Sequence, residues 1–142
     1  MHLDTLLLTL KPAGFLLAIL PLMIDNLHTG RATNLNNFIL LFGGILMLVL
    51  YRTMGWSDRS LLVSGGWIIA GIAVLFLVHG MIGIPSGVAK TLMALLPWFT
   101  VESYLVLITA GLLATALIGF ITRRDAPAVP SLMFAGVVIL SL

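Results

Sequence analysis

The chain has 142 residues, of which 61% are hydrophobic and only 8% are charged. In a soluble domain about a quarter of the residues are charged, so this composition excludes an ordinary soluble protein. It predicts a single integral membrane domain over residues 1–142. The net charge of +2 comes from few residues, no basic cluster indicates nucleic-acid binding, and the absence of Cys excludes disulfides and thiol catalysis.

Six apolar segments follow one another, over residues 5–24, 38–51, 61–82, 88–99, 103–122 and 128–142. Their runs are solidly apolar rather than alternating, so helices are the only form in which they can span a bilayer. We therefore predict an all-α, polytopic transmembrane bundle. The first, third and fifth segments have the roughly 20 residues that a span needs, whereas the others are shorter and would have to extend or tilt. No cationic region precedes the first segment and no small-residue cleavage site follows its apolar run, so we expect it to be retained.

The joints between these segments carry an uneven distribution of positive charge. If every segment crosses, Lys and Arg are more numerous on one side (Arg31, Lys90, Arg123, Arg124) than on the other (Arg52, Arg59). Positive residues favour the cytoplasmic side. The distribution therefore predicts that Asp25 and the joint from Gly83 to Lys90 are cytoplasmic and that both chain ends are outside.

Two charged residues on that side are candidates for chemistry. Asp25 ends the first segment and is either an interfacial helix-end residue or a catalytic or ion-pairing carboxylate. Lys90 opens the fourth segment and is either an interfacial positive residue or the partner of Asp25. Ser86 lies four residues before Lys90, as in a Ser–Lys nucleophile and base, although its place after Pro85 is more typical of a helix N-cap.

Other polar and aromatic residues favour structural roles. His79 ends the third segment without neighbours at a metal-binding spacing, so we interpret it as a hydrogen-bonded helix-end residue and expect neither a metal nor a cofactor. Trp56 and Trp98 lie near the predicted interfaces, which is typical of an aromatic belt.

The order of these features resembles the catalytic core of prepilin peptidases, the type IV leader peptidases, and in particular the small variants of tight-adherence pilus systems. The family pattern begins with an Asp at the cytoplasmic end of a helix and continues through basic and polar residues to Ile-Pro-Asn. Here the stretch runs from Asp25 to Asn34, with Ala32-Thr33-Asn34 in place of Ile-Pro-Asn and with one residue more than the family spacing.

The second family motif is Gly-x-Gly-Asp-x-Lys-Leu, followed by an apolar run and a Trp. The stretch from Pro85 to Trp98 fits if Gly87 is the second Gly and Lys90 is the Lys. In that register Val88 stands at the position of the second catalytic Asp. The resemblance, which extends over about residues 14–142, implies a helical bundle in a bacterial inner membrane, with an aspartyl site near the cytosol. The partners it implies are a prepilin and membrane components of a pilus or secretion system.

An aspartic peptidase needs two carboxylates that share a proton. With Asp25 as one half of the dyad and Val88 in the other position, the resemblance implies a catalytically impaired member, since each proton-transfer role contributes about 10²–10⁴-fold to the rate. Two other hypotheses remain open. One is an active leader peptidase that uses Asp25 and another acid, of which only Asp125 is on the same predicted side. The other is a small transport or channel subunit in which Asp25 and Lys90 line a polar path.

Overall fold

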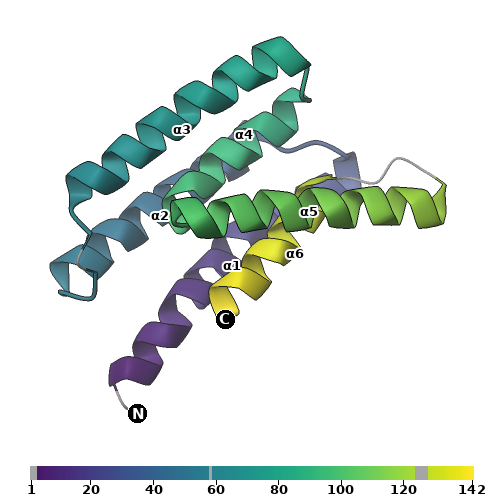
Figure 1. The fold of residues 1–142 in the computed structure, drawn as a ribbon. Helices are drawn as coiled ribbons and strands as arrows, with labels where there is room; N and C mark the ends of the chain where they lie inside the picture. Colours follow the sequence, from purple (N-terminus) through teal and green to yellow (C-terminus); the bar gives the residue numbers. More distant parts are fainter. Residues whose placement is uncertain (1–2, 58, 124–127) are drawn as a thin grey trace.

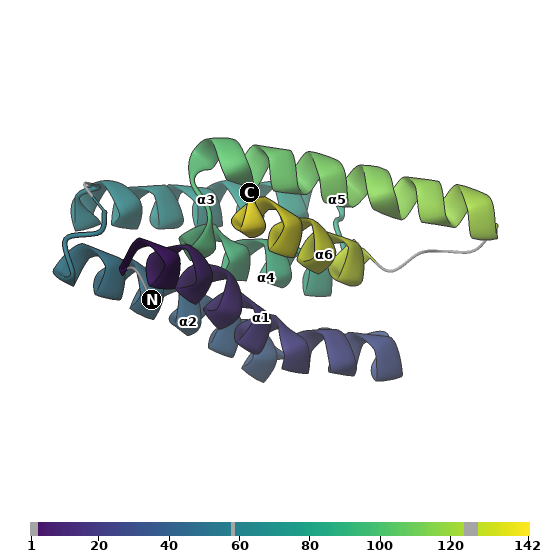
Figure 2. The same ribbon diagram turned by 90° about the horizontal axis from the view of Figure 1, so that it is seen from below.

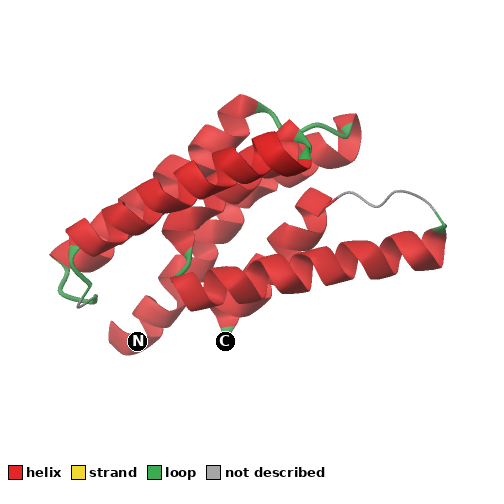
Figure 3. Cartoon of the chain, turned by 45° about the horizontal axis from the view of Figure 1, so that its top comes forward, coloured by secondary structure: helices red, strands yellow, loops and turns green. Residues whose placement is uncertain are grey.

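In the computed structural model, residues 3–57, 59–123 and 128–142 are described, and they form helices without strands (Figure 3). The elements are α1 (Leu3–Thr29), α2 (Asn34–Thr53), α3 (Leu61–Ile82), α4 (Ser86–Leu95), the 3₁₀ helix η1 (Leu96–Trp98), α5 (Val101–Thr122) and α6 (Ala128–Ser141). The prediction of an all-α helical bundle is confirmed.

Four helices within the described residues are long and apolar enough to cross a membrane, rather than six. They are α2, α3, α5 and the part of α1 from Thr9 to Thr29. The helices α4 and α6 have 10 and 14 residues. At a rise of about 1.5 Å per residue they are shorter than the hydrocarbon core of roughly 30 Å. The bundle therefore combines four candidate spans with two shorter helices.

The joint predicted between Asp25 and Asn37 is much shorter than expected, because both neighbouring helices extend into it. Thr33 is the N-cap of α2, with an extended backbone at φ −70° and ψ 149°. The side-chain amide of Asn37 in the following turn donates to the Thr33 carbonyl at 3.2 Å. Since the polar side chains have partners, they do not prevent helix formation. The second segment therefore reaches 20 residues and becomes a candidate span.

The fourth segment lies at the centre of the bundle. Both α4 and η1 pack against α2 and α3, α1 packs against α2 and α6, and α5 packs against α6 (Figures 1 and 2). Trp98 is only 1% exposed, so the prediction of an interfacial ring was wrong for this residue. Its indole Nε1 donates to the Leu40 carbonyl at 2.8 Å. Gly44 makes room for the ring, because a Cβ at that position would lie 2.7 Å from Nε1.

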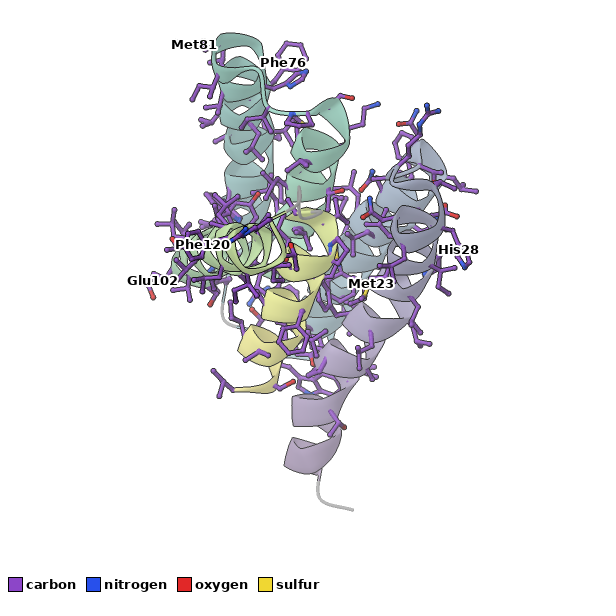
Figure 4. All side chains as sticks on the ribbon, turned by 90° about the vertical axis from the view of Figure 1, so that its right-hand side faces the viewer. Met23, His28, Phe76, Met81, Glu102 and Phe120 are labelled. Atoms are coloured by element: carbon purple, nitrogen blue, oxygen red, sulfur yellow. The ribbon has the colours of Figure 1, made fainter. Side chains whose placement is uncertain are left out.

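The outer surface of the bundle is apolar. The apolar windows of α3 and α5 are each only 11% buried within the chain. Large side chains such as Phe76 and Met81 on α3 and Phe120 on α5 project away from the bundle (Figure 4). A soluble protein rarely exposes apolar patches of this extent. These helices are therefore those of an integral membrane protein, with the exposed side chains in contact with lipid.

Candidate functional site

Asp25 interacts with the beginning of α2. Its Oδ2 accepts hydrogen bonds from Thr33 Oγ1, at 3.0 Å, and from the amide of Asn36. Both donors belong to the N-cap and first turn of α2, where the helix dipole favours a negative charge. The carboxylate of Asp25 thus ties the end of α1 to the start of α2. The prediction that it forms one half of a catalytic dyad stays a prediction.

The other charged candidate, Lys90, interacts with α2 as well. Its Nζ donates to Asn34 Oδ1 at 2.9 Å, so its partner is the Asn34 amide and not Asp25. At the next residue of α4, the buried Thr91 Oγ1 donates to Asn37 Oδ1 at 3.1 Å. These two bonds fix the first turns of α4 against the first turn of α2.

A cavity of about 340 Å³ lies where the end of α1 meets the start of α4. It is lined by Asn26 from α1, by the joint residues Gly30, Arg31 and Ala32, by Pro85 and the first residues of α4 (Ser86, Gly87, Val88), and by Val129 from α6. The joint packs closely against the start of α4, since a Cβ at Gly87 would lie 3.7 Å from that of Ala32, an ordinary van der Waals distance that does not require a glycine. None of the described acidic side chains lines this cavity.

The sequence motifs did not single out Asn26. Its side chain is 7% exposed, and its Oδ1 is buried without a hydrogen-bond partner. The signal that could have identified it is the spacing of buried residues along α1. Phe15, Ile19 and Leu22 are buried at helical spacing, and Asn26 continues this stripe by one more turn. Asp25 lies beside the stripe.

The cavity is lined by the start of α4, which carries backbone donors, and by Asn26, whose unpaired Oδ1 is buried. The first hydrogen bond within α4 runs from the Ala89 N–H to the Pro85 carbonyl. The N–H groups of Ser86, Gly87 and Val88 precede it and have no acceptor inside the helix. An unpaired buried oxygen such as Asn26 Oδ1 costs free energy unless a ligand or water donates to it. The arrangement can therefore bind a group that both donates and accepts hydrogen bonds.

The remaining sequence candidates lie elsewhere. His79 Nδ1 is 2.6 Å from the Ile84 carbonyl, which confirms a hydrogen-bonded residue at the end of α3. Ser86 and Lys90 line different cavities, and the hydrogen bond of Lys90 Nζ goes to Asn34. Asp125 and Arg124 lie outside the described residues. In the described part of the chain, no group of His, Asp and Glu side chains could hold a metal ion.

No family model, curated protein or solved structure matched this chain when it was compared with each of the three.

Proposed function

We propose that this protein is a catalytically inactive, prepilin-peptidase-like membrane protein that binds an extended peptide segment of a membrane partner. The proposal rests mainly on one observation, the composition of the cavity between α1 and α4. Asn26 and Val88 both line it, and both are uncharged. Asp25, one position before Asn26, hydrogen-bonds α2.

The spacing of the first motif is compatible with this proposal. Counted from Asp25, the stretch to Asn34 is one residue longer than the family spacing, and counted from Asn26 the extra residue disappears. In this register Asn26 stands at the first Asp position of the family and Val88 at the second. In this register the chain lacks both carboxylates of the family dyad, rather than only the second.

Neither residue can perform acid–base catalysis. The amide of Asn26 does not exchange a proton with a substrate near neutral pH, and the side chain of Val88 has no proton to donate. A peptide bond in this cavity would therefore meet hydrogen-bonding groups but no pair of acids to activate water. Binding without cleavage is the outcome that these groups favour.

An extended peptide has the complementary groups. Its backbone N–H can donate to Asn26 Oδ1, and a backbone carbonyl can accept from the first N–H groups of α4. Arg31 also lines the cavity and is exposed, so it would attract a peptide with an acidic residue nearby. The apolar segment of a membrane partner would then lie along the exposed helices.

Photo-crosslinking tests the proposal. A benzophenone amino acid replaces Ser86, which is exposed at the cavity, and a matched control carries it at Leu62, which is 88% exposed on α3. Each variant is produced in membranes with a prepilin that has a leader ending in Gly. We expect a crosslink from position 86 to the uncleaved prepilin, with far less from position 62. Equal capture at both positions would contradict peptide binding, and cleaved prepilin that disappears with Asp25→Asn would support the active peptidase instead.

A further inference from the structure

A second cavity, of about 220 Å³, contains two positive side chains. Lys11 reaches it from α1, Arg59 and Ser57 from the segment between α2 and α3, Ser64 from α3, and Thr100 from the start of α5. Lys11 lies close to the start of a candidate span. No acidic side chain of the described residues lines this cavity.

Other polar groups surround the same space. Arg52 Nη1 donates to the Ser57 carbonyl at 3.0 Å, which brings a third cation to this segment. Ser64 is 8% exposed. Its hydroxyl, like that of Ser57, can donate to an anion. Charged residues near the membrane are costly unless they are paired. An anion with several acceptor oxygens would pair both Lys11 and Arg59.

We propose that this cavity binds the phosphodiester of an anionic phospholipid such as phosphatidylglycerol. The two non-bridging oxygens of a phosphodiester accept hydrogen bonds from an ammonium, a guanidinium and neighbouring hydroxyls. The apolar surface beside the cavity favours a lipid over a free ion. The helix α3 begins there, and Leu61, Leu62 and Val63 in its first turn are all exposed. The acyl chains would lie along this surface, while the headgroup enters the cavity.

The net charge of the site distinguishes classes of lipid. A zwitterionic headgroup brings its own ammonium, which two cations would repel, whereas phosphatidylglycerol brings only the negative charge. Each cation near a membrane surface strengthens anionic lipid binding by about 1 kcal/mol, which is roughly fivefold in affinity. We therefore expect that removal of either cation weakens phosphatidylglycerol binding by about fivefold, and that removal of both weakens it by more than tenfold.

The experiment measures binding to the full chain in a neutral detergent, by native mass spectrometry and by thermal shift. The probes are short-chain phosphatidylglycerol, short-chain phosphatidylcholine and inorganic phosphate. The variants are Lys11→Met, Arg59→Gln and the double variant, and the control is Arg123→Gln, which removes one exposed cation at the end of α5. We expect phosphatidylglycerol to bind most tightly to the wild type and to the control, and less tightly to the other variants.

Several results would overturn the proposal. Unchanged binding in Lys11→Met/Arg59→Gln, or equal binding of both lipids, excludes this lipid site. Equally tight, Arg59-dependent binding of inorganic phosphate indicates a site for a free anion. Asp58 precedes Arg59 and lies outside the described residues. If the wild type binds no phosphatidylglycerol and Asp58→Asn creates binding, Asp58 supplies the counter-charge instead. Because Arg59 is exposed, Arg59→Gln keeps the test valid even if Lys11→Met does not fold.

Discussion

The two polar ends of the α1–α2 pair differ in how their charges are paired. At the amide end, which we define by Asp25, Asn34, Asn36 and Asn37, each of these side chains has a hydrogen-bond partner. At the cationic end, defined by Lys11, Arg52 and Arg59, the described charges have the same sign. A polar residue that stands out in the sequence can therefore have all of its hydrogen bonds within the fold. A candidate for binding is the group that the fold leaves unpaired.

Asn26, the neighbour of Asp25 in the chain, illustrates this. Asp25 is the more conspicuous residue in the sequence, but its carboxylate connects two helices. Asn26 is less conspicuous, yet its buried Oδ1 has no partner and it lines the cavity. Four substitutions test this contrast between the two ends.

Gly44→Ala should destabilise both ends together. Gly44 lies in the middle of α2, and a Cβ there would approach Trp98 Nε1 to 2.7 Å and Pro97 Cβ to 2.8 Å. Overpacking of this kind costs about 1–3 kcal/mol. Unfolding in detergent should show the loss. Gly65→Ala is the matched control, because a Cβ at position 65 meets nothing within 4 Å and should be neutral or slightly stabilising. Equal stability of the two variants would contradict the central packing of Trp98.

Thr91→Val should weaken only the amide end. Thr91 is fully buried, and the single proton of its hydroxyl is within hydrogen-bonding distance of both Asn37 Oδ1 and the Gly87 carbonyl. Valine preserves the shape but leaves these acceptors without their donor, at a cost of about 1–3 kcal/mol. Thr109→Val controls for loss of a hydroxyl, since Thr109 is exposed and bonds only within its own helix. Lipid binding at the cationic end should stay unchanged. A loss there would mean that the two ends are coupled.

Asp25→Asn should lower stability and leave prepilin uncleaved, as in the wild type. Asparagine keeps the shape of the side chain but lacks the negative charge of the carboxylate, whose Oδ2 accepts hydrogen bonds from Thr33 and Asn36. The substitution removes charge-assisted hydrogen bonds and the favourable interaction of the negative charge with the α2 N-terminus. Together these losses should lower the free energy of unfolding by about 1 kcal/mol. Unfolding at neutral pH measures the change. If stability does not change while prepilin cleavage is lost, Asp25 serves chemistry rather than the fold.

Asn26→Leu should separate folding from binding. Replacing the amide with an apolar side chain of similar size removes a buried oxygen that lacks a partner, so the folded state should be unchanged or more stable by up to about 1 kcal/mol. Crosslinking of prepilin from position 86 should nevertheless decrease. A clear loss of stability would show that Asn26 contributes to the fold through a contact such as a bound water.

The helical class and the apolar boundaries could be predicted because they depend on composition and run length. The third segment agrees at both ends with α3, over residues 61–82. The length of the second segment was underestimated. Asn36 and Asn37 fit into α2 because they form hydrogen bonds with partners that sequence order does not reveal. Trp98 was misplaced for a similar reason. Its partner, the Leu40 carbonyl, lies far away in the sequence.

The proximity of the two polar stretches could be predicted, whereas the catalytic roles assigned to them stay predictions. The structure places the residues after Asp25 next to the start of α4, and the sequence had grouped these two stretches. It could not indicate which of two adjacent polar residues faces the cavity, because that depends on the rotation of α1. The buried stripe that ends at Asn26 contains this information, and it becomes interpretable only when the packing of α1 is known.

A cleavage assay in reconstituted liposomes determines whether the cavity between α1 and α4 is catalytic. Wild type, Asp25→Asn and Asn26→Asp/Val88→Asp are each incubated with a prepilin whose leader ends in Gly. We predict that the wild type and Asp25→Asn leave the prepilin intact to the same extent, because no pair of acids among the described residues lines the cavity. The double variant is the one that introduces two carboxylates there, and any cleavage should be confined to it. Cleavage by the wild type that is abolished in Asp25→Asn would contradict the account.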